Sequence, residues 1–419
     1  DFRGRMYANT AFLNPQGEDT AKGLLEFSTG KALGASGLAW LKVHISNSWG
    51  FDKASLEDRV EWTENNEDMI MRIGIDPLES REWMDADKPW QFLRACFEYV
   101  CCNNNEDYVS HLPVTVDGSC NGLQHFSAML RDDIGGAATN LINHEQPEDI
   151  YEIVRREAEN AMVLDNNPEF NIWGSGGCLS RALVKRPVMT TPYGATLYGM
   201  RDQIHEELKK QLDKGVVFPG IDSSTDMWPH CKYLAFNIYE AIGRVVISSR
   251  LGMKWLQDVA KASNKLKRPI YWTLPTGFVV KQKYIRSIVK EIKTIINGRM
   301  ASLFAGSSDA EKMHSFRQVN GIAPNFVHSL DACHLMKTIV SARDNHGIES
   351  FAVVHDSFGT HACDIEQLGM VLRETFVDIY KEDILKKFME EQGDLELPSL
   401  PEYGKLNIED VKNAEFFFS

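Results

Sequence analysis

The chain has 419 residues, with 45 Lys and Arg against 59 Asp and Glu, and a formal net charge of -14. A hydrophobic content of 43% and a charged content of 25% are ordinary for a globular chain and exclude a disordered or fibrous protein. No apolar run reaches the roughly 18 residues of a membrane span, and no secretory signal opens the sequence. Eight cysteines without a C-x-x-C pair are too few for a disulfide scaffold, so we expect a reduced, intracellular protein of two or three domains.

The charge is unevenly distributed along the chain. Residues 51–90 contain twelve acids and five bases, whereas residues 279–299 contain six bases and one acid. An acidic total taken alone argues against a nucleic-acid partner, because phosphate binding requires a basic surface. Because the acidic and basic residues are concentrated in different segments, the acidic total does not exclude a nucleic-acid partner. We expect residues 51–90 to form an outer surface that faces away from any nucleic acid.

The first half of the chain predicts a strand, a turn and then helices. Residues 111–116 are rich in β-branched side chains and lead into Asp117-Gly118, which is typical of a strand that ends in a turn. Residues 146–149 carry a proline followed by two acids, which favours the start of a helix. Apolar side chains then recur at helical spacing from Ile150 to Met162.

The second half predicts two pairs of strands and a long helix. Residues 271–274 and 278–280 flank a Pro-Thr-Gly turn, which indicates a β-hairpin. Residues 351–354 and 358–362 are apolar strands on either side of a His-Asp-Ser tripeptide. The pattern from 365 to 389 is helical. Together these elements indicate a mixed α and β fold with more helix than strand.

Two aspartates lie at the ends of predicted strands. Asp117 follows the first strand, and Asp356 lies in the turn between the last two. Paired carboxylates from distant parts of a chain are what a two-metal phosphoryl-transfer site requires, and their oxygens suit Mg²⁺. For either aspartate alone, an ordinary turn residue is the alternative interpretation.

A basic segment lies between these two aspartates. Arg181 and Lys185 are four residues apart, so on a helix they share one face and can clamp one polyphosphate. The alternative is an exposed basic helix face. Pro187 and Pro192 are expected to kink or end this helix.

These segments, taken together and in this order, resemble the single-subunit, phage-type DNA-dependent RNA polymerases of small tailed phages and mitochondria. Residues 117–125 are similar to motif A of that family, residues 181–194 to motif B, and residues 355–357 to motif C. Residues 324–329, with the sequence Pro-Asn-Phe-Val-His-Ser, resemble a further signature. The resemblance covers essentially the whole chain, and residues 126–132 and the basic stretch favour a phage member over a mitochondrial one.

The resemblance implies an α+β fold with the right-hand polymerase architecture. The first part of the palm is expected at residues 1–145, the fingers at 146–328, and the second part of the palm at 329–419 with a C-terminal foot. It also implies that the N-terminal domain and the thumb are absent from this chain.

The resemblance also implies roles for individual residues. Asp117 and Asp356, helped by the Gly118 carbonyl, would hold two Mg²⁺ ions, and Lys185 would also protonate departing pyrophosphate. The implied substrate-binding residues are Arg181, Lys185, Tyr193, Gly194, His328 and Tyr151, although Tyr151 is equally well explained as a packed helix-surface residue. The implied nucleic-acid contacts are Arg3, Arg5, Arg186, Lys293 and Arg299.

Related DNA polymerases share the two-aspartate plan but carry a glutamate five residues after the first aspartate, where it blocks a ribose 2′-hydroxyl. Here that position is Gly122, which is expected to leave room, so we predict a ribonucleotide substrate. A DNA polymerase of the related family and an inactive fragment that only binds nucleic acid are the alternatives.

The basic stretch falls where phage members carry a promoter-reading hairpin, expected here at about residues 279–312. Glu291, Lys293 and Arg299 are candidates for base contacts, and a solvated basic face is the alternative. The implied partners are a double-stranded DNA promoter and template, nascent RNA and nucleoside triphosphates. We expect a monomer with no membrane contact, in the cytoplasm of an infected cell rather than in a mitochondrial matrix.

Overall fold

The computed structural model describes residues 2–103, 105–165, 167–222 and 224–419. Helices predominate, and the strands form one three-stranded and three two-stranded antiparallel sheets. The predicted α+β class is confirmed. None of the helices in these ranges is both long enough and apolar enough to cross a membrane.

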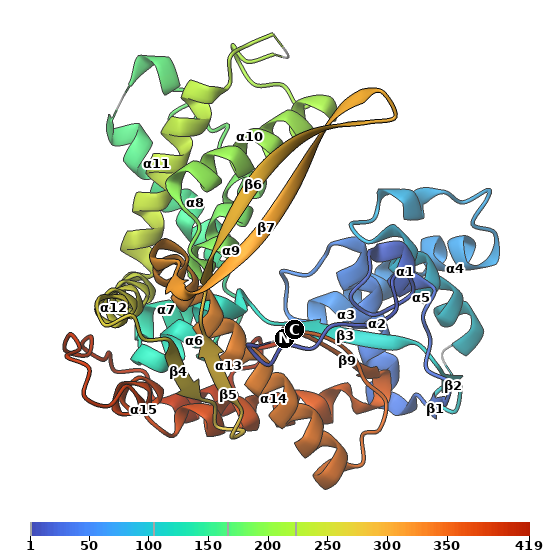
Figure 1. The fold of residues 1–419 in the computed structure, drawn as a ribbon. Helices are drawn as coiled ribbons and strands as arrows, with labels where there is room; N and C mark the ends of the chain where they lie inside the picture. The colour runs from blue at the N-terminus through green and yellow to red at the C-terminus, as the bar shows by residue number, and fades with distance from the viewer. Residues whose placement is uncertain (1, 104, 166, 223) are drawn as a thin grey trace.

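A small central sheet joins two segments that are far apart in the sequence (Figure 1). β3 (Pro113–Asp117) pairs with β9 (Ser357–His361), and β9 pairs with β8 (Ala352–Val354). Val114 and Val116 are buried, as the alternation of side chains along a strand requires. The strands predicted around 111–116, 351–354 and 358–362 are therefore confirmed to within two residues.

The first hundred residues form helices that lie beside this sheet (Figure 1). Ser55 accepts a hydrogen bond from the backbone of Asp58, and the Asp58 side chain accepts one from Ser55, so a capping box starts the helix that follows. The elements are α1 (Asp19–Gly23), α2 (Gly34–Trp49), α3 (Leu56–Asn65), α4 (Glu67–Ile75), η1 (Glu82–Asp85) and α5 (Pro89–Cys102), with β1 (Lys31–Ala32) paired to β2 (Val109–Ser110).

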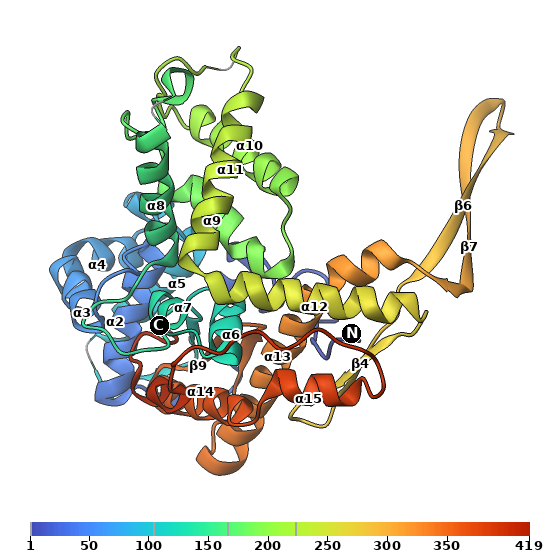
Figure 2. The same ribbon diagram turned by 90° about the vertical axis from the view of Figure 1, so that its left-hand side faces the viewer.

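Four helices surround a second hydrophobic core, which includes Trp173, Leu183 and Ile238. They rise above the sheet in Figure 2. The elements are α8 (Ile150–Asp165), η2 (Pro168–Phe170), α9 (Arg181–Thr190), η3 (Thr191–Tyr193), α10 (Leu197–Asp213) and α11 (Trp228–Val245). The predicted helices near 150 and 180 are confirmed. α9 continues through Pro187 and ends before Pro192.

The remaining helices pack into the first core with the sheet, except α7, whose Ala138 belongs to the second core. They are α6 (Asn121–Leu130), α7 (Asp133–Ala138), α12 (Ile247–Lys265), α13 (Ser315–His346), η4 (Ala362–Asp364), α14 (Ile365–Tyr380), α15 (Ile384–Glu391) and η5 (Ile408–Asn413). The prediction of a single helix over 365–389 is wrong in one respect. The helix breaks at 381–383, where Asp383 caps α15 by accepting a hydrogen bond from the Lys386 N–H.

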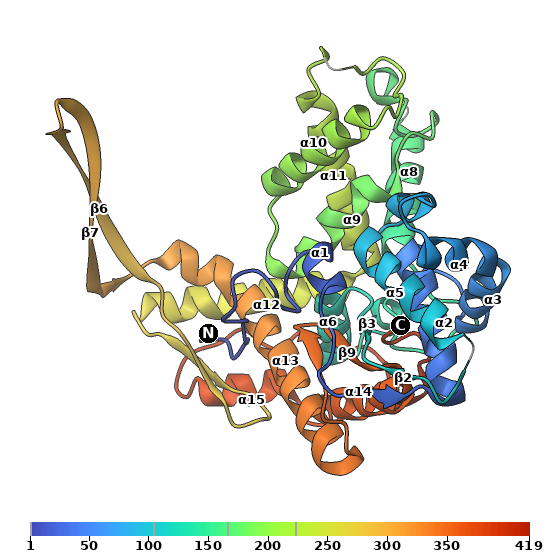
Figure 3. The same ribbon diagram turned by 90° about the vertical axis from the view of Figure 1, so that its right-hand side faces the viewer.

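Two hairpins follow α12. β4 (Ile270–Thr273) and β5 (Val279–Gln282) form the predicted one. β6 (Ile285–Ile296) and β7 (Arg299–Met313) form a longer one, whose turn Asn297-Gly298 has positive φ at both residues. This longer hairpin projects away from the rest of the chain (Figures 2 and 3). The last residue of the second hydrophobic core is Val246, whereas the fingers were predicted to extend to residue 328. The predicted domain boundaries at 145 and 328 therefore stay predictions.

Candidate active site

The two predicted metal-binding aspartates lie side by side at one end of the central sheet. Asp117 is the last residue of β3 and is paired with Ser357, the first residue of β9, directly after Asp356. The Gly118 N–H donates to the Asp356 carbonyl over 3.2 Å, which ties the two turns together. Both aspartates line a cavity of about 370 Å³. Residues that are 239 positions apart in the chain thus meet at one site.

The turn that carries Asp356 is tight. His355 and Asp356 are the only residues between β8 and β9, and His355 has φ of 49°, in the left-handed region. The ring of Tyr7 packs edge-on against His355, with 5.2 Å between centroids. Because both strand ends are fixed by the ladder, the position of the Asp356 carboxyl is determined by the backbone.

The electrostatic surroundings of the two carboxyls differ. Burial, followed by the negative charge of Asp117, raises the pKa of Asp356. The Asp117 side chain is 55% exposed, and the Lys88 ammonium lies 3.9 Å from its Oδ2. Two carboxylates that share one cavity repel each other, and a cation between them would relieve this repulsion.

Arg181 and Lys185 of α9 line the same cavity, as their spacing predicted. The Arg181 Nε donates to Asp149 over 2.5 Å, and the guanidinium lies 5.1 Å from the ring centroid of Tyr151. Burial, followed by the charge of Arg181, lowers the pKa of Lys185. Tyr151 also lines the cavity and is hydrogen-bonded to Cys120, and burial raises its pKa. The neighbouring Arg186 points elsewhere and pairs with Glu206 on the exposed surface.

A second group of predicted residues lies outside the lining of this cavity. The rings of Tyr193 and His328 contact each other at a tilt of 33°, with centroids 4.6 Å apart, and Gly194 follows in the left-handed conformation. Arg3 contributes a hydrogen bond of 3.0 Å to the His328 Nδ1. Burial, followed by the charges of Arg5 and Arg3, lowers the pKa of His328 to about 3, so its imidazole is neutral at pH 7.

The other basic residues predicted to contact nucleic acid are dispersed. Arg5 is held by a buried ion pair with Asp331 on α13. Lys293 and Arg299 are exposed residues of the β6–β7 hairpin. Lys293 pairs with Ser302 and Arg299 with Ile296, so the alternation of strand side chains puts these two cations on opposite faces of the hairpin. If one face of the hairpin lies in a groove of a duplex, only one of these two side chains can point into that groove.

A sequence model of the family described as DNA-dependent RNA polymerase matches residues 31–394. The chain is 36% identical over 472 residues to T7 RNA polymerase of Escherichia phage T7, and the match covers all of this chain and 52% of that protein.

The chain belongs to the DNA-dependent RNA polymerase family. It is also 37% identical to the mitochondrial DNA-directed RNA polymerase 1B of Nicotiana tabacum, and 35% identical to the DNA-directed RNA polymerase of Enterobacteria phage T3. These matches cover the whole chain and 42% and 52% of the two relatives. The chain therefore spans about half the length of such relatives, or less. Because phage and organellar polymerases match it at similar identity, a phage source stays a prediction.

The structure brings further residues to the cavity that no motif indicated. Asp52 and Lys53 come from the loop after α2, and Asp87 and Lys88 from the start of α5. The backbone of Lys88 donates to the Ser48 carbonyl over 3.0 Å, which fixes this segment to the end of α2. Both ends of residues 51–90 thus contribute to this cavity, and the expectation that the stretch faces away from nucleic acid stays a prediction.

A smaller cavity of about 240 Å³ lies next to the same two aspartates. Asp117, Asp356 and Lys88 line both cavities, whereas Lys22 and Gln91 line only the smaller one. The two carboxylates thus lie between the two cavities, and only the larger cavity is lined by Arg181 and Lys185.

The end of the sequence lies against this site. Phe418 forms a β-bridge with Gly118, and the Ser419 N–H donates to the Asp117 carbonyl over 3.3 Å. Phe416, Phe417 and Phe418 are all buried. The aromatic residues therefore support the turn that follows Asp117.

Gly122, in the first turn of α6, has less space than the sequence suggested. A Cβ at this position would lie 2.9 Å from the Cβ and Cγ of Pro192 and 3.0 Å from the Cζ of Tyr193. The space directly beside Gly122 is filled by the ring of Tyr193 and by Pro192, and the expectation that this position leaves room for a ribose 2′-hydroxyl stays a prediction. What the glycine permits is the close approach of Tyr193 to α6.

Proposed function

We propose that this chain contains the catalytic core of a DNA-dependent RNA polymerase, a nucleotidyltransferase that extends RNA along a DNA template. One observation carries the proposal. Asp117 and Asp356, from separate parts of the chain, share a cavity with Arg181 and Lys185. Carboxylates opposite a cationic helix face suit the transfer of a phosphoryl group, in which positioning and charge stabilisation provide most of the acceleration.

The donor atoms fit two Mg²⁺ ions. The carboxylates of Asp117 and Asp356 and the carbonyl of Gly118 are hard oxygen ligands, and Mg²⁺ is commonly held by one or two carboxylates together with substrate phosphates. When bound, the ions supply charge stabilisation to the attacking and leaving oxygens. In this proposal the protein contributes the fixed strand ends that hold both carboxylates.

In the proposed reaction, the RNA 3′-oxygen forms a bond to the α-phosphorus of a nucleoside triphosphate, and the bond to pyrophosphate breaks. Arg181 and Lys185 bind the triphosphate, and Lys185 gives its proton to the departing pyrophosphate. The lowered pKa of Lys185 makes that proton easier to release. Tyr151 lies against the Arg181 guanidinium and helps to orient it.

We further propose that Tyr193, Gly194 and His328 border the incoming ribose and base. A neutral His328 accepts the bond from Arg3, which keeps the imidazole in one orientation against Tyr193. The proposed nucleic-acid contacts remain Arg3, Arg5, Arg186, Lys293 and Arg299.

The proposal includes the right-hand polymerase architecture, in which palm residues come before and after a fingers region in the sequence. Its partners are promoter and template DNA, nascent RNA and nucleoside triphosphates. The monomeric state, the promoter-reading role of the β6–β7 hairpin and the location in an infected cell belong to the same proposal. Relatives named as DNA-directed RNA polymerases from phages and plant organelles support the class of reaction.

The test is extension of a preformed RNA–DNA scaffold, which does not depend on promoter recognition. The parent chain should add ribonucleotides, and Lys185→Met should slow addition by about 10²-fold or more, as loss of a stabilising cation does. Lys254→Met, which removes a lysine from the exposed surface of α12, is the matched control. Equal use of deoxyribonucleotides would favour the related DNA polymerase. Scaffold binding without extension would favour a fragment that only binds nucleic acid.

A further inference from the structure

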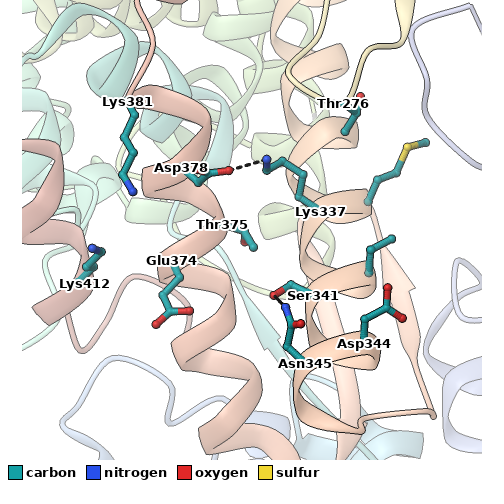
Figure 4. Close-up of a pocket in the computed structure, with 12 residues that line it drawn as sticks. Thr276, Lys337, Ser341, Asp344, Asn345, Glu374, Thr375, Asp378, Lys381 and Lys412 are labelled. Carbon is teal, nitrogen blue, oxygen red and sulfur yellow. Dashed lines mark hydrogen bonds and ion pairs between the residues drawn. The ribbon is translucent and has the colours of Figure 1, made fainter.

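Two cavities larger than the candidate active site lie elsewhere on the chain. One, of about 790 Å³, lies between α13 and α14 (Figure 4). Its lining carries three lysines and three acids, and Lys337 and Asp378 neutralise each other over 2.5 Å. Because the positive and negative charges of this lining balance, they favour neither an anionic nor a cationic ligand. The other cavity, of about 710 Å³, is different in this respect.

This second cavity, called the acidic groove below, lies between α2, α3 and α14. Its wall includes Trp40 and Val43 of α2, Val60 of α3, and Met370 of α14. Its charged residues are Glu57, Glu61, Glu64, Glu366, Glu415 and Arg373. Five carboxylates therefore surround an apolar wall with one guanidinium.

The acids of α3 are arranged along one face of the helix. Glu57, Glu61 and Glu64 follow each other at spacings of four and three residues, and like charges at such spacings destabilise a helix. Glu64 is paired with Lys42 over 2.6 Å. In the described part of the chain, the side chains of Glu57 and Glu61 have no ion-pair partner. Two exposed carboxylates thus remain available beside an apolar wall.

The one cation of the groove is already engaged. The Arg373 guanidinium donates to the carbonyl of Ala414 over 2.8 Å and to that of Glu415 over 3.0 Å. It therefore holds the C-terminal segment in place, and its single positive charge offsets only one of the five carboxylates. Residues 56–64, the part of the acidic stretch that forms α3 and lies outside the lining of the candidate active site, form one side of this groove.

We infer that the acidic groove binds a basic, amphipathic helix of a partner protein. Grooves of this kind accept the apolar face of a helix, and the flanking residues of that helix determine charge specificity. Here leucine-like side chains would cover Trp40, Val60 and Met370, and lysines or arginines beside them would meet Glu57 and Glu61. Charge complementarity is the argument for this occupant, because an acidic or uncharged helix would leave the two carboxylates without counter-ions.

The groove also contacts the support of the active site. Val116 and Phe418 line it from below. Val116 directly precedes Asp117 in β3, and Phe418 forms the bridge to Gly118. A helix in the groove would therefore touch both residues that position the turn after Asp117. We expect its binding to change the rate of RNA extension.

The test uses a fluorescently labelled helical peptide of leucine and lysine, about 14 residues long, with its apolar residues on one face. Fluorescence anisotropy should show binding to the parent chain. Glu61→Lys should weaken it by about fivefold to tenfold, as reversal of a charge contact does. Met370→Ser, at an exposed position, should weaken it severalfold through lost apolar contact. Asp68→Lys makes the same charge change on α4 in the acidic stretch, outside the groove, and should change binding by less than about twofold.

Three outcomes would overturn the inference: no binding of the peptide, an equal effect of Glu61→Lys and Asp68→Lys, or displacement of the peptide by octylammonium at similar concentrations. The last would assign the groove to small hydrophobic cations instead. Peptide binding does not require catalysis, so a chain that fails to extend RNA but binds the peptide refutes the proposed function and leaves this inference standing.

Discussion

Replacement of Gly122 by alanine tests whether the close approach of Tyr193 to α6 is required for nucleotide addition. The added methyl group would stand 2.9 Å from two carbons of Pro192 and 3.0 Å from the Cζ of Tyr193. Carbon atoms pack at about 3.5–4.0 Å, so the tyrosine ring must retreat by roughly 0.5–1 Å. The ring of Tyr193 contacts that of His328, with centroids 4.6 Å apart, and the displacement therefore reaches both rings.

The size of the effect follows from this displacement. Overpacking of a filled site costs about 1–3 kcal/mol. Alanine recovers up to about 1 kcal/mol through its higher helix propensity, so the net loss of folding stability should be small. Catalysis is more sensitive, since misplacement by about 1 Å can cost about 10²-fold. We expect Gly122→Ala to lower kcat/KM for ribonucleotides by about 10- to 100-fold.

The assay is single-nucleotide extension of an RNA–DNA scaffold, accompanied by urea denaturation to measure stability. Gly199→Ala is the matched control, because this residue also lies in the first turn of a helix and its added Cβ meets only the Thr196 Oγ1 at 3.5 Å. The control should retain the parent rate. If Gly122→Ala extends RNA as fast as Gly199→Ala, then the contact between α6 and Tyr193 is not required and this reasoning is wrong.

The same geometry predicts the result of a larger substitution. A glutamate at position 122 begins from the same crowded Cβ and needs still more space. Gly122→Glu should therefore reduce the use of ribonucleotides and deoxyribonucleotides together. A clean switch to deoxyribonucleotides would show that Tyr193 can move aside without loss of function.

Three further predictions concern other parts of the chain. Asp117→Asn and Asp356→Asn should each abolish RNA extension while scaffold binding by anisotropy is retained, and persistent synthesis would refute the two-metal assignment. Arg5→Ala should lower the free energy of unfolding, measured by urea denaturation, by about 3–5 kcal/mol, because it leaves the Asp331 carboxylate, which is 1% exposed, without its partner. Restoration of stability when Asp331→Asn is added would confirm this cause. A loss below about 1 kcal/mol would contradict it. Burial lowers the pKa of His334 to about 4, so the unfolded chain binds a proton below about pH 6.5 that the folded chain rejects, and this residue should account for a loss of about 2 kcal/mol of stability between pH 7 and pH 5. Because His44 and His328 also have lowered pKa values, His334→Gln should reduce the total loss over this range by about 2 kcal/mol, and an unchanged loss would assign it to other groups.

The sequence predicted those parts of the fold that depend on local patterns. The β-branched residues before Asp117 and the apolar runs on both sides of Asp356 indicated strands, and these strands form the central sheet. The spacing of Arg181 and Lys185 predicted a shared helix face, and both line one cavity. In each case the evidence lies within a few neighbouring residues, where periodicity is informative.

Features that depend on distant contacts were not predicted. Lys88 lies 3.9 Å from Asp117 because α5 packs beside the sheet, and no motif surrounds this lysine in the sequence. The crowding at Gly122 comes from residues 70 positions later in the chain. The break between α14 and α15 depends on a single capping residue, Asp383, within an otherwise helical pattern.

The formal charge of the candidate active site bears on how substrate would bind. Its lining has six carboxylates against four cationic side chains, and burial lowers the pKa of the adjoining His44 to about 4, so that this ring adds no charge at pH 7. A cavity with an excess of negative charge repels a free triphosphate, even though Arg181 and Lys185 lie on its wall. Two divalent cations would reverse the sign of that excess. The acidic character of the chain is thus compatible with a polyanionic substrate, provided that the triphosphate and the metal ions bind together, and triphosphate affinity measured in EDTA should be far weaker than in Mg²⁺.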